Sequence, residues 1–180
     1  MKFIRKILIT NDDGFSATGI NILKNILLNY SQEVFTVAPF SNQSGSGRSI
    51  TLGTEIKYKK ISNFDWVVHG TPADSMIFAL NKIFTQDKPD FIFSGINAGS
   101  NIGDEISYSG TVGAAFEGAL RGIPSLALSQ AGATNDKNTF EVSKNFLPTI
   151  ISKLSKIFSN KALLYNINFP NCDNVDVKDI

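Results

Sequence analysis

Two acidic residues stand side by side near the start of the chain, in the segment Thr10-Asn11-Asp12-Asp13-Gly14. They follow a short apolar run, so the pattern predicts two carboxylates at the end of a buried strand. Burying adjacent carboxylates is unfavourable unless an opposite charge neutralises them, and a divalent cation is the simplest such charge. An exposed Asp-Asp-Gly turn would give the same tripeptide, and for the motif taken alone that alternative stays open.

A second polar segment, Phe40–Ser49, is rich in hydroxyl groups, amides and glycines and contains Gln43-Ser44-Gly45. As a ligand-binding loop it could offer neutral oxygens and backbone N–H groups. A flexible linker would have a similar composition, so this segment by itself does not decide between the two interpretations.

A third polar segment, Gly95–Gly110, is long for a connection, and long loops are often functional. It leads into Ser109-Gly110-Thr111 at a predicted helix start, where free N–H groups, the helix dipole and two hydroxyls favour an anion. A simple helix cap would explain one hydroxyl but not the surrounding glycines. The sequence contains neither a Walker A motif nor a G-x-G-x-x-G at the first crossover, which disfavours an ordinary dinucleotide site.

The candidate ligands are oxygens only, which suits Mg²⁺ or Mn²⁺ better than zinc or copper. A hard cation beside an anion site indicates phosphoryl chemistry, in which the metal polarises the phosphoryl group and activates water. The adjacent acids do not form the Asp-x-Asp pattern of phosphatases that pass through an aspartyl-phosphate. His69, near a strand end, is interpreted as a structural histidine, although its place at the strand end leaves a role in a site open. Cys172 supports no argument. One cysteine and one histidine exclude a Cys/His zinc site.

The elements that must position these residues alternate between strands and helices, which predicts an α/β fold with a mostly parallel sheet. Loops that follow parallel strands meet at the carboxyl edge of the sheet, where ligands bind. The predicted strands are Ile7–Thr10, Val34–Ala38, Phe91–Ser94, Ser125–Leu128 and Leu163–Phe169.

Four helices are expected between the strands. The first carries an apolar stripe that includes Ile20 and Leu23, and the second begins at Thr71, which can act as its N-cap. The third runs from about residue 111 to residue 121. The fourth covers residues 140–158 and is expected to kink or split at Pro148. Residues 50–61 alternate apolar and polar side chains, which predicts a hairpin arm half in water.

Composition narrows the function classes. The chain has 180 residues, is 42% hydrophobic and has a net charge of +1, so it predicts one folded domain with a sizeable core. No polybasic run supports binding to a nucleic-acid polymer or an anionic membrane. No apolar stretch is long enough for a membrane span, and the amino terminus does not read as a signal peptide. These features predict a reduced, cytoplasmic protein.

The ordered motifs are strongly similar to those of the SurE family, stationary-phase survival proteins known as metal-dependent 5′-nucleotidases. The resemblance covers residues 7–170, and its six ordered blocks make it specific. The matching segments are Ile9–Phe15, Val37–Pro39 with Gln43–Gly45, Gly70–Asp74, Ser94–Asn97, Asn101–Gly103, and Tyr108–Ala115 with Glu117-Gly118.

The resemblance implies a Rossmann-like three-layer sandwich and one divalent metal per subunit, held by Asp12, Asp13, Ser44 and Asn97. It also implies hydrolysis of nucleoside monophosphates. Asp12 or Asp13 would then orient or deprotonate water, while Asn101, Ser109, Gly110 and Thr111 would bind the phosphate.

Family members assemble as dimers or tetramers through an exchanging carboxyl-terminal extension. The resemblance predicts a single domain over residues 1–180 without that extension. The alternative function is a non-catalytic metal- or nucleotide-binding remnant.

Overall fold

The computed structural model describes residues 3–134, 136–154, 158 and 163–177. At its centre is a seven-stranded sheet with the order β3-β4-β2-β1-β5-β6-β7. Neighbouring strands are parallel except β3, which is antiparallel to β4. The strands are β1 (Ile4–Thr10), β2 (Ser31–Pro39), β3 (Lys57–Lys60), β4 (Asp65–His69), β5 (Phe91–Ala98), β6 (Ser125–Gln130) and β7 (Leu164–Phe169). The predicted α/β class is therefore confirmed.

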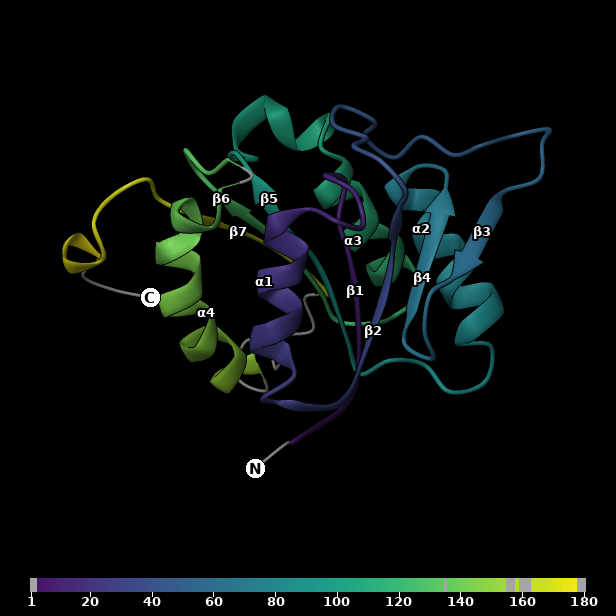
Figure 1. Ribbon diagram of the computed structural model, residues 1–180, viewed down its shortest axis with the longest axis horizontal. Helices are drawn as coiled ribbons and strands as arrows, with labels where there is room; N and C mark the ends of the chain where they lie inside the picture. The colour runs from purple at the N-terminus through teal and green to yellow at the C-terminus, as the bar shows by residue number, and fades with distance from the viewer. Residues whose placement is uncertain (1–2, 135, 155–157, 159–162, 178–180) are drawn as a thin grey trace.

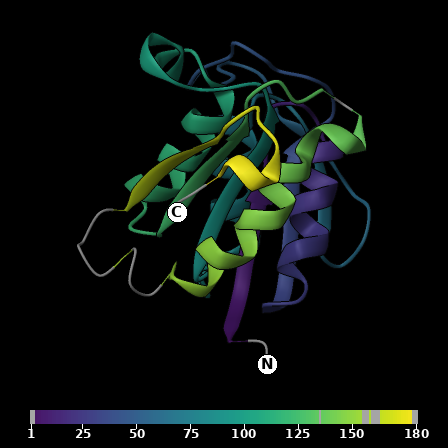
Figure 2. The same cartoon turned by 90° about the vertical axis from the view of Figure 1, so that its left-hand side faces the viewer.

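Helices cover both faces of the sheet and complete a three-layer arrangement (Figures 1 and 2). Helices α1 (Thr18–Leu27) and α4 (Glu141–Ser152) pack on one face. Helix α2 (Pro72–Phe78), which continues into the π-helix η1 (Ala79–Ile83), packs on the other face with α3 (Gly110–Leu120). The short 3₁₀ helices in the described part of the chain include η2 (Gly103–Ser107), η3 (Lys137–Phe140) and η5 (Asn174–Asp176).

The apolar residues of β1, the central strand, are consecutive because both of its faces are covered. Ile7 and Ile9 belong to the hydrophobic core that includes Leu23 of α1, whereas Leu8 belongs to the core that includes Met76 of α2. All five side chains are fully buried. Because side chains alternate between the faces of a strand, a strand covered on both faces needs apolar residues at every position.

Strand β5 is longer than predicted and places Asn97 within the strand. It continues beyond Ser94 to Ala98, and its register against β6 shifts between Ser94 and Asn97. Glycine and asparagine are depleted in strands, so residues 95–98 read as a loop in the sequence. Pairing with β6 overrides that local preference.

The predicted arm over residues 50–61 is wrong over most of its length. Only β3 pairs with β4, and all four of its side chains are exposed. Thr51 is instead drawn toward α2, because its backbone N–H and its hydroxyl both donate to Asp74.

Helix α4 is not split at Pro148, which lies inside it. The buried side chains of Leu147, Ile150 and Ile151 hold the turns on both sides of the proline in the core. The helix ends at Ser152, and residues 155–157 of the predicted helix lie outside the described residues.

The predicted cap of α2 is confirmed and forms a complete capping box. Asp74 N donates to Thr71 Oγ1 over 3.0 Å, and Thr71 N donates to Asp74 Oδ2 over 2.9 Å. Pro72 occupies the first turn, where its missing N–H leaves no helix bond unmade.

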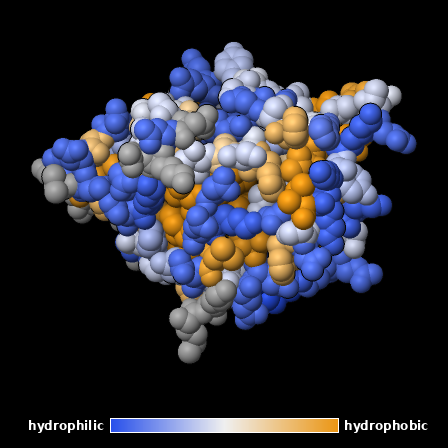
Figure 3. Space-filling model, in the orientation of Figure 1, coloured by the Kyte–Doolittle hydropathy of each residue, from blue (hydrophilic) through white to orange (hydrophobic). Residues whose placement is uncertain are grey.

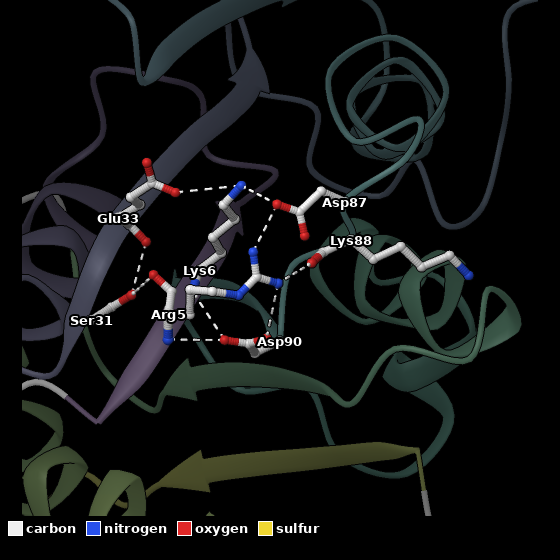
Figure 4. A network of polar contacts seen from close by, with 7 residues as sticks. All are labelled: Arg5, Lys6, Ser31, Glu33, Asp87, Lys88 and Asp90. Atoms are coloured by element: carbon white, nitrogen blue, oxygen red, sulfur yellow. Dashed lines mark hydrogen bonds and ion pairs between the residues drawn. The ribbon is translucent and has the colours of Figure 1, made fainter.

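The amino end of the sheet carries a charged network (Figure 4). Arg5 and Lys6 of β1 both contact the carboxylate of Asp87, at 2.7 and 2.5 Å, and Arg5 also lies 3.5 Å from Asp90. The network ties the start of β1 to the segment before β5, at the end of β1 opposite Asp12.

Apolar side chains appear in separate groups among polar ones on the face seen in Figure 3. Among the described helices, none has the length and apolar character needed to cross a membrane.

Candidate functional site

The strand order changes direction beside β1. Strands β2 and β4 continue the sheet on one side of β1, and strands β5, β6 and β7 continue it on the other. In such a sheet, ligands bind at the carboxyl ends of the strands where the order reverses. The segments after β1 and at the end of β5 carry Asp12, Asp13 and Asn97, so these side chains lie at the switch point.

Asp12 is buried against the start of α3. Asp12 is only 4% exposed, and Thr111 Oγ1 donates a hydrogen bond to Asp12 Oδ1 over 2.5 Å. Burial raises the pKa of Asp12. The Thr111 hydroxyl and the backbone amides of Asp12, Thr111 and Gly110 act in the opposite direction by stabilising the charged form.

Asp13 lies beside the end of β5. Ala98 N donates to Asp13 Oδ2 over 3.1 Å, which ties the first loop to the strand that carries Asn97. Burial raises the pKa of Asp13 to about 6, the Ala98 amide lowers it, and the neighbouring charge of Asp12 raises it further. Both carboxylates are thus harder to ionise than ordinary aspartates.

Ser44 reaches the site on a loop that is bonded to the first one. The backbone N–H of Gln43 donates to the Asp12 carbonyl over 2.7 Å, and Ser44 N donates to Asn42 Oδ1 over 2.7 Å. The loop also rests on α3, where Arg48 pairs with Glu117 at 2.9 Å.

A hollow of about 280 Å³, here called the site hollow, joins these loops. Its lining includes Asp12, Ser44 and Asn97, three of the four predicted metal ligands. Asn97 Nδ2 donates to the Gly99 carbonyl over 3.0 Å, so the amide is held by its nitrogen end. Asp13 does not line the hollow but reaches the same strand end through Ala98.

The predicted phosphate contacts divide into two pairs. Asn101 and Ser109 line the site hollow, and the Ser109 hydroxyl also accepts from Val112 N over 3.1 Å as the cap of α3. Gly110 and Thr111 are buried behind it and contact Asp12. A Cβ on Gly110 would lie 2.8 Å from Asp12 Cβ and 3.0 Å from Asp12 Oδ2.

Asn101 is fixed by polar residues that sequence reasoning missed. Its side-chain nitrogen donates to Ser129 Oγ over 2.8 Å, and its backbone N–H donates to Asn168 Oδ1 over 2.8 Å. The side chain of Asn166 donates to the Asn101 carbonyl over 2.8 Å. Asn166 and Asn168 lie two positions apart in β7. Because asparagine is depleted in strands, this pair is the signal in the sequence that could have indicated the network.

His69, interpreted from the sequence as a structural histidine with a site role left open, lies at the surface. It is exposed at the end of β4, and its ring stacks on Phe40 with centroids 4.9 Å apart. Strand β4 ends at His69, which leaves this side chain at the edge of the sheet. Both rings line a second hollow of about 320 Å³ with Thr51 and Thr71.

The donor set fits a hard divalent cation. Within the described residues, neither Asp12 nor Asp13 forms an ion pair, although burial disfavours both charges. Buried charges are normally paired or bound to metal. No group of three or more His, Cys, Asp or Glu side chains that could hold a metal ion occurs in the part of the chain that the structure describes. A cation at this position would therefore need the hydroxyl of Ser44 and the amide oxygen of Asn97.

Comparisons with known proteins agree with this architecture. The family model described as "Survival protein SurE" matches residues 7–180. A protein of Wolbachia pipientis subsp. Culex pipiens named 5′-nucleotidase SurE is 50% identical over 171 residues, which are 94% of this chain and 66% of the relative. A protein of the same name from Wolbachia sp. subsp. Drosophila simulans is 47% identical over 94% of this chain and 67% of its own length.

The structural comparison extends the likeness to the backbone. The crystal structure of SurE protein from Aquifex aeolicus superposes with a TM-score of 0.82 and 38% sequence identity, covering 96% of this chain and 69% of that one. The chain spans about two thirds of the length of the curated relatives it matches. The sequence match, the shared sheet and the agreement over residues 7–180 show that this chain belongs to the SurE family.

Proposed function

We propose that the protein is a divalent-metal-dependent phosphomonoesterase that hydrolyses nucleoside 5′-monophosphates to nucleoside and phosphate. The observation that carries the proposal is the pair Asp12 and Asp13, placed at the switch point of the sheet without an ion-pair partner among the described residues. The names of the relatives support it, because these proteins are called 5′-nucleotidases.

In the proposed site, Asp12, Asp13, Ser44 and Asn97 hold one Mg²⁺ or Mn²⁺ ion. When bound, the ion supplies Lewis-acid polarisation of the phosphoryl group and lowers the pKa of water. The two carboxylates then have separate tasks: the Thr111 hydroxyl holds Asp12 in one orientation, while Asp13 has the higher exposure and orients or deprotonates the attacking water.

The phosphate lies over the start of α3. Asn101 and Ser109 line the hollow at this point and donate hydrogen bonds to phosphate oxygens. The partial positive charge at the N-terminus of α3 favours the developing negative charge, while the Gly110 and Thr111 amides hold the Asp12 carboxylate. The network from Ser129, Asn166 and Asn168 keeps Asn101 in place, which limits the rearrangement needed in the transition state.

The test is hydrolysis of p-nitrophenyl phosphate and AMP with Mn²⁺, followed by chelation with EDTA and re-addition of Mn²⁺. We expect phosphate release that EDTA abolishes and Mn²⁺ restores. Asp12→Asn and Asp13→Asn should remain folded and lose tight Mn²⁺ binding in calorimetry. Asp87→Asn, at the opposite end of β1, is the matched control and should bind Mn²⁺ normally. Tight Mn²⁺ binding without any hydrolysis would instead support a non-catalytic binding protein.

The proposal includes a cytoplasmic location and assembly of the whole protein as a homodimer or homotetramer. The single Cys172, which forms no disulfide, fits a reducing compartment. Light scattering of the purified protein measures the oligomer directly.

A further inference from the structure

One large aromatic side chain stands unpacked at the rim of the site hollow. Tyr108 is 68% exposed and lines the hollow together with Asp12 and Ser109. Within the described residues, its ring stacks on no other ring and its hydroxyl makes no hydrogen bond. An aromatic ring that lines a polar hollow can stack on the planar part of a ligand bound there.

The backbone beneath this ring is fixed on both sides. Gly47 N donates to the Tyr108 carbonyl over 2.9 Å, and Tyr108 N donates to the Glu105 carbonyl over 3.0 Å. The following residue, Ser109, caps α3. The position of the Tyr108 backbone relative to the proposed phosphate site is thus set before any ligand binds. This reduces the conformational entropy that is lost when a ligand contacts the ring.

The lining of the site hollow suits the phosphate end of a nucleotide. At about 280 Å³ the hollow lies at the small end of the range for pockets that hold drug-sized ligands. Its floor carries the polar groups of Asp12, Asn97 and Ser109, which suit the phosphate. The largely exposed ring of Tyr108 lines the same hollow, where it can meet a base attached to that phosphate through ribose.

We propose that Tyr108 is a specificity-determining residue whose ring stacks on the planar base of a nucleoside monophosphate. This inference rests on the function proposed above and names the part of the substrate that the site selects. Every base has a π-face, so stacking on Tyr108 favours nucleotides over aliphatic phosphate esters without selecting one base.

The stacked pair Phe40 and His69 is the other aromatic surface at this edge of the sheet. The two rings already lie against each other at an interplanar angle of 26°, and none of the predicted metal or phosphate ligands lines their hollow. The Tyr108 ring is unstacked and lines the same hollow as Asp12. Tyr108 is therefore better placed than the Phe40–His69 pair to stack on a base.

The substitutions Tyr108→Ala and Tyr108→Phe separate the ring from its hydroxyl. Stacking of a base on an aromatic side chain corresponds to about 1–3 kcal/mol on alanine substitution, or about a 5- to 150-fold change. We expect Tyr108→Ala to lower kcat/KM for AMP within this range and to change kcat/KM for ribose 5-phosphate less than about twofold. Tyr108→Phe should keep the preference for AMP.

Tyr58→Ala is the matched control. Tyr58 is 49% exposed on β3, and its ring contacts Phe78 rather than the site hollow. It should leave the ratio of the two kcat/KM values unchanged. Equal losses for AMP and ribose 5-phosphate in Tyr108→Ala, or no loss for either, would overturn the proposal.

A binding measurement separates this inference from the proposed hydrolysis. A phosphonate analogue of AMP, with CH₂ in place of the ester oxygen, is titrated calorimetrically into the Mn²⁺-loaded protein, with methylphosphonate as the ligand lacking a base. We expect Tyr108→Ala to weaken binding of the analogue alone. If the wild-type protein hydrolyses neither substrate, the proposed function fails, and this titration still decides the role of Tyr108. Unchanged analogue binding overturns the inference, as does light scattering that shows a smaller oligomer in Tyr108→Ala, because the ring would then belong to a subunit interface.

Discussion

Gly113 of α3 lies directly against the backbone of Gly47 in the loop that carries Ser44. A Cβ placed on Gly113 would be 2.3 Å from the Gly47 carbonyl oxygen, closer than real Cβ contacts allow. The obstacle is backbone rather than a flexible side chain, so the loop itself would have to move. A glycine in the middle of a helix, unfavourable in itself, is therefore required by the loop that forms one wall of the site.

Gly113→Ala should lower the free energy of unfolding by about 1–3 kcal/mol, because the strain of overpacking exceeds the gain in helix propensity. It should also weaken Mn²⁺ binding, since displacement of Gly47 moves Ser44. Urea unfolding and calorimetry measure the two effects.

The matched control is Gly118→Ala in the same helix, where a Cβ would lie 2.4 Å from both Ile92 Cδ1 and Ser125 Oγ. That clash is with the sheet and not with the loop, so stability should fall while Mn²⁺ affinity of the folded protein is kept. Equal losses of Mn²⁺ affinity in both variants would contradict the role of Gly113.

The metal-free protein should become less stable as pH rises through the folded pKa of Asp13. Burial raises that pKa to about 6 from an ordinary 3.8, so between these values the folded state binds more protons than the unfolded state. The free energy of unfolding therefore falls with rising pH in that window.

Asp13→Asn removes the penalty. Compared with wild type, it should be more stable at pH 8 and nearly equal at pH 4, as measured by urea unfolding in EDTA. Because protons compete with the cation, Mn²⁺ affinity of the wild type should drop below about pH 6. A wild-type stability that rises from pH 4 to pH 7 in parallel with that of Asp13→Asn would show that Asp13 is not perturbed.

Thr111→Val should raise the pKa of Asp12 further and destabilise the fold. Thr111 is fully buried, and its hydroxyl is a side-chain donor to the Asp12 carboxylate across 99 residues of sequence. Valine has the same shape but no donor, so we expect a loss of about 1–3 kcal/mol in unfolding free energy. Relative to wild type, Mn²⁺ affinity should be reduced more at pH 6 than at pH 8. Thr111→Ser keeps the hydroxyl and should keep most of the Mn²⁺ affinity; equal defects in both variants would show that the hydrogen bond from this hydroxyl to Asp12 does not set the Mn²⁺ affinity.

Asp74→Ala should destabilise the protein by about 2–4 kcal/mol. The Asp74 carboxylate accepts from Thr51 N, Thr51 Oγ1 and Thr71 N, at 2.9, 2.6 and 2.9 Å, so one substitution removes the capping box and the anchor of the segment after Ser49. Asp74→Asn retains an acceptor oxygen and should lose about half as much. Protease cleavage near residues 50–56 should increase in Asp74→Ala, and an unchanged cleavage pattern would show that Asp74 does not hold this segment.

Local pattern was sufficient for the elements that depend on neighbouring residues. Consecutive apolar residues predicted the central strand because both of its faces are covered, and Thr71-Pro72-Ala73-Asp74 predicted a cap whose bonds span only three residues. The motif blocks predicted the family, which the match over residues 7–180 confirmed. These features need no knowledge of where distant segments lie.

The tertiary structure decided how the predicted site residues are arranged. Pairing of β5 with β6 places Asn97 within β5. Thr111 contacts Asp12, and His69 is exposed at the end of β4. The sequence by itself determined which residues could bind a cation and phosphate, because side-chain chemistry belongs to each residue. Which of them line the hollow, and which lie behind it, depends on strand register and helix packing, and these are set by contacts between residues far apart in the chain.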